Sequence, residues 1–104
     1  MDDLNSVLLE GIVIGSYNVG RSDRFSGQRI DIVSQRTNPR QGRKNGNSRF
    51  TVDLSRLPEF TRINCRRGVR LRVVGFLDRP ERGQALVVAE HLEIKAGGVH
   101  AAAL

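Results

Sequence analysis

Cysteine is almost absent from this chain, since Cys65 is the only one among 104 residues. A single thiol excludes an intrachain disulfide and is typical of a reducing compartment, so we expect a cytoplasmic protein. Long apolar runs are absent as well. No segment approaches the roughly 18 apolar residues of a membrane span, and the acidic start MDDLN is followed by only a short apolar run. The sequence therefore predicts neither a membrane segment nor a signal peptide.

Residues suited to catalysis or metal binding are also scarce. His91 and His100 are the only histidines, neither is near Cys65 in the sequence, and no set of residues has metal-ligand spacing. Glu90 and Glu93 would point to opposite faces of one strand, where they cannot form a carboxylate pair. We therefore expect a protein that is not an enzyme and that needs no cofactor and no metal.

The charge of the chain is unbalanced. Seventeen basic residues against 11 acidic ones give a net charge of +6, and every basic residue except Lys44 and Lys95 is an arginine. A guanidinium group matches a phosphate through two parallel hydrogen bonds and stacks on bases, which favours a nucleic-acid partner. A GC-rich genome would give the same preference for arginine without a functional cause. The length indicates one small domain with a limited core, for which an oligomer is expected.

The basic residues are concentrated in residues 35–50, which contain no acid and are rich in Gly, Asn, Pro and Ser. Such a composition predicts a flexible loop between two strands, because Gly and Asn add conformational entropy and Arg resists burial. A loop of this kind is suited to wrapping a polyanion, although it could also be merely solvated. Its basic residues, each a candidate phosphate contact, are Arg36, Arg40, Arg43, Lys44 and Arg49.

Hydrophobic alternation predicts an all-β domain. Strands are expected at residues 4–15, 28–36, 49–55, 69–77 and 84–95, with a polar connection at 16–27 and a bulge or bend at Gly11. A short helix is expected within residues 57–67, between the third and fourth strands. This order matches the OB-fold, a five-stranded, partly open Greek-key barrel. Small sandwiches and Sm-like barrels also have five short strands.

The alternation also predicts which side chains point inward. In the second strand Ile30 and Ile32 are expected inside and Asp31 outside. The predicted core further includes residues of the third strand, the helix and the fourth strand: Phe50, Val52, Leu54, Leu57, Phe60, Ile63, Val69, Leu71 and Val73. Residues 96–104 have no periodicity and are expected to form a flexible tail, so the folded domain is expected to cover residues 1–95.

Three segments resemble one protein family. The start matches an N-x-V-x-L-x-G pattern through Asn5, Val7, Leu9 and Gly11. FTVDLSRLPEF and RRGVRLRVVGFL are similar to that family's third strand, helix, Lys-Gly turn and fourth strand, and LVVAEHLEI to its last strand. Together they resemble bacterial single-stranded DNA-binding proteins, including the related primosomal replication protein N, over residues 4–95. The resemblance implies an OB-fold that binds single-stranded DNA as a homodimer or homotetramer.

The chain departs from the family pattern on the binding face. It has no tryptophan, and Arg49 or Ser48 and Ser55 stand where the third strand of the family carries aromatic residues. The hairpin before the last strand is shortened to DRPERG, and the acidic, Phe-ended tail is missing. The primosomal relative, a lone basic OB-fold without a tail, shares these features. We therefore expect limited base stacking, for which Tyr17 and Phe25 in the first connection are the candidates.

A second acid-free segment lies between Glu59 and Asp78. Arg70 and Arg72 are expected on the outward face of the fourth strand, where they would serve either a nucleic-acid groove or a subunit interface. The first strand is apolar on both faces, and a free edge strand would gain from pairing, which predicts at least a dimer.

The functional prediction is non-enzymatic, electrostatic binding of single-stranded DNA in an OB-fold groove without base readout, in DNA replication, recombination or repair. One alternative is an OB-fold interaction subunit that docks on replication proteins and binds nucleic acid weakly. Another is binding of single-stranded RNA, because contacts to the 2′-hydroxyl leave no sequence motif.

Overall fold

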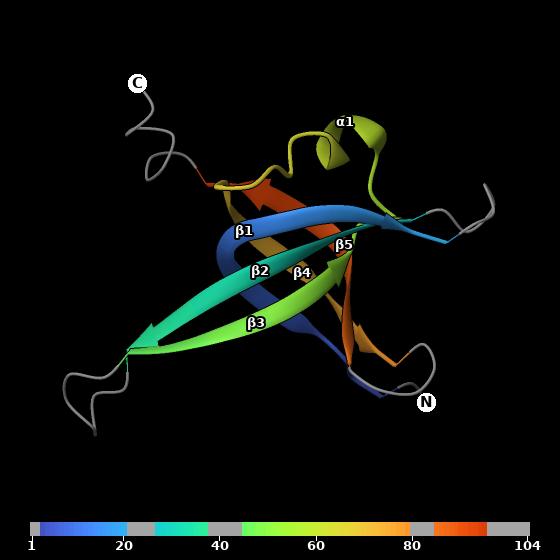
Figure 1. The fold of residues 1–104 in the computed structure, drawn as a ribbon. Coiled ribbons are helices and arrows are strands. Elements are labelled where there is room, and N and C mark those ends of the chain that lie inside the picture. Colours follow the sequence, from blue (N-terminus) through green and yellow to red (C-terminus); the bar gives the residue numbers. More distant parts are fainter. Residues whose placement is uncertain (1–2, 21–26, 38–44, 80–84, 96–104) are drawn as a thin grey trace.

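In the computed structural model, five strands form a closed barrel and a single turn of helix precedes the fourth strand (Figure 1). The structure describes residues 3–20, 27–37, 45–79 and 85–95, so the expected tail lies outside the described residues. These residues confirm the predicted all-β OB-fold with its helix between the third and fourth strands. The elements are β1 (Val7–Val19), β2 (Gly27–Thr37), β3 (Asn45–Asp53), α1 (Glu59–Arg62), β4 (Arg70–Asp78) and β5 (Leu86–Ile94).

The strands close in the order β1-β2-β3-β5-β4. The first half of β1 pairs with β4, and its second half pairs with β2, both antiparallel. Closure between β3 and β5 is parallel and short, with only the pairs Val52–Val87 and Asp53–Val88. Each described strand therefore has two neighbours. The sequence-based prediction of a free edge strand is wrong, because β1 is long enough to pair with both β2 and β4.

Side chains that alternate along the strands fill the barrel. The predicted inward positions of β2, β3 and β4 are confirmed at Ile30, Ile32, Val52, Leu71 and Val73, which are fully buried. The remainder of the core comes from both ends of the chain and from the segment around α1: Leu9, Val13, Leu54, Leu57, Cys65, Val87 and Ala89. A core of this size gives the outer strand faces a rigid support, which is what a binding surface on those faces requires.

Gly11 does not bend β1 as the sequence suggested. The bulge lies between Val13 and Gly15, and Gly11 is instead a point of close approach between strands. A Cβ atom at Gly11 would collide with Ile32 and with the backbone of Val33, because β1 there crosses tightly over β2. The bulge has a consequence for function, since it changes which side chains of the second half of β1 point outward.

Gly68 forms the turn that leads into β4. Its φ of 93° lies in the left-handed region, which favours glycine. The turn brings the Gly68 N–H to the Val13 carbonyl at 2.8 Å, and the Val13 N–H donates to the Val69 carbonyl at 2.9 Å. The Arg67-Gly68 pair, which resembles the Lys-Gly of the family, thus anchors the start of β4 against β1 at the bulge.

The helix is shorter than predicted, and its apolar residues point outward. It spans four residues after Pro58, and Phe60 and Ile63 are 70% and 61% exposed, so their predicted burial is wrong. Leu57 and Cys65 flank the helix and are buried in their place. One turn of helix cannot present a continuous apolar stripe, so the residues before and after it fix its position. Phe50, also expected in the core, is 37% exposed.

Candidate nucleic-acid interface

The outer face of β1, β2 and β3 collects a row of polar side chains. Directly opposed residues of an antiparallel pair point to the same face, and the register pairs Asp31 with Gly15 on one side and Thr51 on the other. The next pairs on this face are Tyr17 with Arg29 and Val33 with Arg49. Arg29 in turn pairs with Asp53 of β3, so two arginines, a tyrosine and a second aspartate surround Asp31 on one sheet surface, which we call the β1–β3 face.

Asp31 is the hydrogen-bonding centre of the β1–β3 face. Its Oδ1 accepts the Thr51 hydroxyl at 2.9 Å and the Tyr17 hydroxyl at 3.2 Å. The Tyr17 side chain remains 40% exposed, and the space above Gly15 is open, since a Cβ atom there would meet no atom within 4 Å. The arrangement holds an aromatic ring by its hydroxyl beside an open, glycine-lined surface.

Tyr17 lies on a strand and not in a loop, because β1 continues to Val19 instead of ending at residue 15. The sequence prediction of a polar connection over residues 16–27 is therefore wrong for its first four residues. The strand persists although Ser16, Tyr17 and Asn18 are exposed, since each pairs with a residue of β2. Phe25, the other aromatic residue proposed for stacking, lies outside the described residues.

β2 and β3 continue past the barrel as a two-stranded ribbon (Figure 1). Their pairing runs through Gln35–Asn47 and Arg36–Gly46 to Thr37–Asn45. Much of the stretch predicted as a flexible loop is therefore paired strand, and only its middle part is left to connect the two strands.

Two of the five predicted basic residues lie among the described residues. Arg49 is exposed on β3 of the β1–β3 face, and the backbone of Arg36 lies on β2 opposite Gly46. Arg40, Arg43 and Lys44 lie outside the described residues. Among the described residues, Arg49 belongs to none of the ion pairs. Its charge is therefore available to an external anion.

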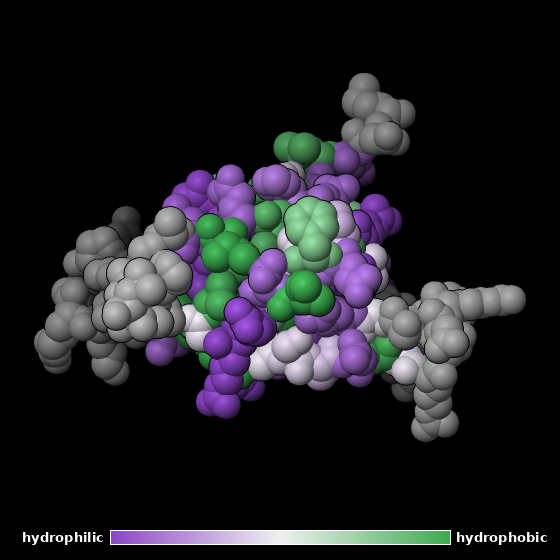
Figure 2. All heavy atoms as spheres, turned by 90° about the horizontal axis from the view of Figure 1, so that it is seen from above, coloured by the Kyte–Doolittle hydropathy of each residue, from purple (hydrophilic) through white to green (hydrophobic). Residues whose placement is uncertain are grey.

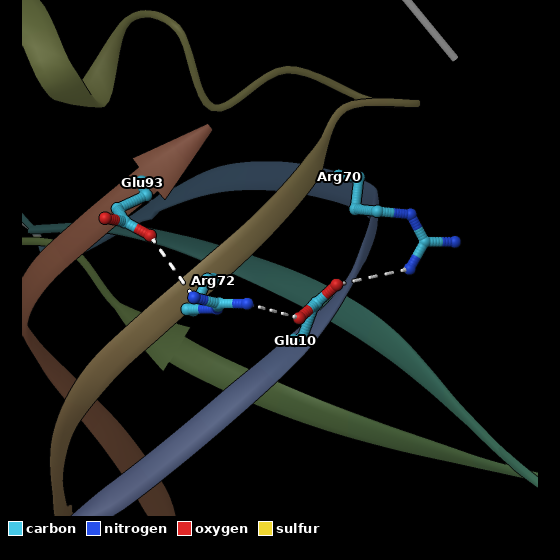
Figure 3. Close-up of polar contacts among 4 residues, drawn as sticks. All are labelled: Glu10, Arg70, Arg72 and Glu93. Carbon is cyan, nitrogen blue, oxygen red and sulfur yellow. Dashed lines mark hydrogen bonds and ion pairs between the residues drawn. The ribbon is translucent and has the colours of Figure 1, made fainter. Parts of the chain in front are cut away.

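Arg70 and Arg72 lie on another surface, the outer face of β1, β4 and β5. As Figure 3 shows, Glu10 of β1 lies between them and Glu93 of β5 lies on the far side of Arg72. Glu10 is 4.0 Å from Arg70 and 3.5 Å from Arg72, and Glu93 is 3.8 Å from Arg72. The four charges sum to zero. The sequence correctly placed both arginines outward, but the structure brings them together with acids and not with Arg49.

The surface around this ion-pair network, which we call the β4 face, is partly apolar. Leu8 is 71% exposed on β1 and pairs with Val74 of β4. Together with Arg72, His91 and Glu93 these two residues line a shallow hollow of about 270 Å³. Exposed leucine beside self-neutralised charges is more typical of a protein contact than of a phosphate contact.

The region around α1 carries another apolar surface. Phe60 and Ile63 are largely exposed there, and the view from above, which looks onto α1, shows hydrophobic atoms among hydrophilic ones (Figure 2). Nearby in the sequence, the guanidinium of Arg56 lies 5.0 Å from the ring centre of Phe76, a cation–π contact that joins this segment to β4.

Cys65 is part of the core and is not a reactive thiol. Its side chain is 1% exposed, its Sγ contacts the Thr61 carbonyl at 3.4 Å, and burial raises its pKa from 9.0 to about 11. Within residues 3–20, 27–37, 45–79 and 85–95, no three His, Cys, Asp or Glu residues are grouped as metal ligands. In the same residues, no helix is long and apolar enough to cross a membrane.

The sequence interpretation missed Gly15, Asp31 and Thr51 as members of the candidate site. Alternation did place Asp31 outward, but nothing in the pattern indicated that Tyr17 would lie on the same sheet. That juxtaposition depends on the extension of β1 and on its bulge, both of which are set by pairing with β2 and by the Gly68 turn.

No protein-family model and no curated protein sequence matches the chain, so solved structures supply the comparison. The PriB protein of Ralstonia solanacearum has a TM-score of 0.70 at 13% identity, over 88% of this chain and 98% of that one. A small single-stranded DNA-binding protein from Streptomyces coelicolor has a TM-score of 0.70 at 16% identity, over 92% and 97%. The Plasmodium falciparum SSB in complex with single-stranded DNA has a TM-score of 0.65 at 14% identity, over 91% and 97%.

These similarities extend over nearly the full length of both chains in each comparison, whereas the sequences have diverged to at most 16% identity. The resemblance predicted from the sequence motifs is thereby confirmed at the level of structure. The chain has the OB-fold shared by PriB and single-stranded DNA-binding proteins.

Proposed function

We propose that the chain binds single-stranded DNA, without catalysis, along the β1–β3 face and through the basic segment that connects β2 to β3. The observation that carries the proposal is a difference in ion pairing between the two outer faces. Arg49 lies on the β1–β3 face without an ion-pair partner among the described residues, whereas Arg70 and Arg72 on the β4 face are neutralised by Glu10 and Glu93. Only the first face combines free positive charge with an exposed aromatic ring.

The proposed mechanism is electrostatic capture assisted by one ring. Arg49 and the basic residues that follow β2 would contact phosphates, and each neutralised phosphate releases counterions. Tyr17 would stack on one base, with its hydroxyl held by Asp31. The names of the structural neighbours support single-stranded DNA as the substrate. We propose replication, recombination or repair as the process and the cytoplasm as the location.

Fluorescence anisotropy with oligo-dT, the matching duplex and single-stranded RNA, across a salt series, tests the proposal. We expect oligo-dT to bind more tightly than the duplex, with an affinity that falls steeply as salt rises. Equal affinity for the duplex would refute the single-strand specificity, and tighter binding of RNA would reassign the substrate.

A second function, docking on replication proteins, is favoured by one observation. Phe60 on α1 and Ile63 directly after it are large apolar side chains that are exposed, and neither belongs to the ion-pair network of the β4 face. If docking is the function, the dissociation constant for oligo-dT should be about micromolar or weaker, which is close to non-specific affinity at physiological salt. Pull-downs should then recover a protein partner with the native chain and lose it with Phe60→Ser. Recovery unchanged by that substitution would remove α1 as the docking surface.

Self-association through the β4 face is our proposal for assembly, as a homodimer or homotetramer. Leu8 is exposed there, and the Glu10–Arg72 pair beside it presents both signs of charge to a second copy. Light scattering at tens of micromolar should give at least a dimer, and Leu8→Lys should shift it toward monomer. A monomeric native chain would contradict the proposal.

A further inference from the structure

The centre of the β1–β3 face is occupied by a carboxylate, which is unexpected on a surface that binds polyanions. Asp31 lies between Arg29 and Val33 along β2, with Tyr17 and Thr51 as hydrogen-bond donors from the two neighbouring strands. A phosphate placed over Asp31 would be repelled. If single-stranded DNA crosses this face, as the proposed function requires, a base and not the backbone must lie above this carboxylate.

The shape of the surface provides a place for that base. Gly15 lies directly opposite Asp31 in the strand register, and the space that a side chain at Gly15 would fill is open. The ring of Tyr17, two residues farther along the same face of β1, borders this space and is partly exposed. A base lying over Gly15 would therefore have an aromatic neighbour and would turn one edge toward Asp31.

The two oxygens of Asp31 differ in what they can accept. Oδ1 receives both hydroxyl groups, from Tyr17 and Thr51, which uses its two lone pairs and fixes the orientation of the carboxylate. Among the described residues, no donor reaches Oδ2. Oδ2 is therefore the oxygen of this held carboxylate that remains available to accept a hydrogen bond from a base.

We infer that Asp31 selects bases by accepting a hydrogen bond from an exocyclic amino group, so that this site prefers cytosine to uracil or thymine. The N4 amino group of cytosine is a donor that carboxylates recognise. Uracil and thymine carry a carbonyl oxygen at that position, which the carboxylate repels, and their N3–H lies between two such oxygens. The inference departs from the sequence expectation of binding without base readout.

The test compares oligo-dC with oligo-dU of equal length, because they differ at the amino group and lack the methyl group of thymine. At mildly alkaline pH, where cytosine is neutral, the native chain should bind oligo-dC about tenfold more tightly, within the range for a good base contact. In Asp31→Asn the ratio should fall to about one, since an amide can accept from N4 or donate to O4. Glu90→Gln on β5 removes the same charge from an exposed position and should keep the native ratio.

A steric variant tests the same site without altering Asp31. Gly15→Val fills the open space with a residue that strands accommodate well, and should weaken oligo-dC more than oligo-dU, bringing the ratio to about one. Circular dichroism and thermal unfolding establish that each variant is folded, and the ratio in the native chain is informative even if a variant is not.

Three results would overturn the inference. Equal binding of oligo-dC and oligo-dU by the native chain refutes base selection and leaves the proposed function intact. A native preference for oligo-rU over oligo-dU that disappears in Asp31→Asn would assign the acceptor to the ribose hydroxyl instead. Absence of binding to oligo-dC, oligo-dU and oligo-dT alike would refute the proposed function together with the inference.

Discussion

Replacing Arg49 should weaken single-stranded DNA binding, whereas replacing Arg72 should not. Both residues are exposed or half-exposed arginines on outer strand faces, so composition does not distinguish them. Their surroundings do. Arg49 has no acidic partner among the described residues, whereas the guanidinium of Arg72 is 3.5 Å from Glu10 and 3.8 Å from Glu93. Arg49→Ala removes a free positive charge, and Arg72→Ala removes one that is already compensated.

The size of the effect follows from counterion release. One phosphate contact on a single strand contributes about 0.7 to the slope of log affinity against log salt. Arg49→Ala should therefore flatten the slope by about 0.7. The ratio of native to variant affinity should then change about fivefold for each tenfold change in salt concentration. Arg72→Ala should leave the slope unchanged. Its cost in stability should also be small, about 0–1 kcal/mol, because the ion pairs are solvent-exposed.

Anisotropy titrations of labelled oligo-dT at several salt concentrations give these slopes for the native chain and both variants. The two variants carry the same change in net charge, so a general loss of positive charge would flatten both slopes alike. Equal slopes for the two variants would refute the assignment of the β1–β3 face, and a change confined to Arg72→Ala would move the interface to the β4 face.

Three further predictions follow from the charge, packing and burial described above. Changing the three basic residues between β2 and β3 to alanine should weaken binding to all sequences alike and flatten the salt slope by about 0.7 per lost phosphate contact; an unchanged slope would make this segment a solvated bystander. Those residues are Arg40, Arg43 and Lys44. Gly75→Ala should lower the free energy of unfolding by about 1–3 kcal/mol or more, because the added Cβ would collide with the Val88 carbonyl. Gly15→Ala, whose Cβ would meet no atom within 4 Å, is the control in thermal unfolding. Equal melting temperatures for the two variants would contradict the packing. Because burial raises the pKa of Cys65 from 9.0 to about 11, the contribution of the buried thiol to stability is present below pH 9 and is lost as the pH rises toward 11. Denaturant titrations should therefore show a smaller loss of unfolding free energy at alkaline pH for Cys65→Ala than for the native chain. An identical loss would contradict the burial of the thiol.

The sequence predicted the barrel well where one face of a strand is buried. In β3 and β4, alternation identified Val52, Leu71 and Val73, together with Leu54 directly after β3, because only the core face of these strands excludes water. The motifs then supplied the order of the strands. Local pattern and tertiary structure agree in these segments, so the sequence alone predicts the fold class.

Prediction failed where pairing, and not burial, stabilises the strand. Ser16, Tyr17 and Asn18 are exposed and polar, yet they extend β1 because β2 supplies hydrogen bonds. The ribbon beyond the barrel can also contain Gly and Asn, because its two strands are held by pairing and bury little surface. Phe60 failed differently, since a one-turn helix is positioned by Leu57 and Cys65 on either side of it.

The candidate site required the three-dimensional register. Tyr17 and Thr51 lie 14 and 20 residues from Asp31 in the sequence, and the three residues come from three strands. No local pattern connects them, and the bulge after Val13 decides which residues of β1 face outward. The partners of Arg72 were hidden in the same way, because Glu10 is 62 residues away in the sequence.

The emission of Tyr17 is the most direct report on the proposed interface. The chain has one tyrosine and no tryptophan, so its intrinsic fluorescence above about 300 nm comes from the β1–β3 face alone, where the ring is a candidate for stacking. Titration with oligo-dT, corrected for absorption with free tyrosine, should quench this emission in parallel with the rise in anisotropy. Quenching should weaken together with affinity as salt increases. Anisotropy that rises to saturation while the tyrosine emission stays constant would contradict binding on the β1–β3 face.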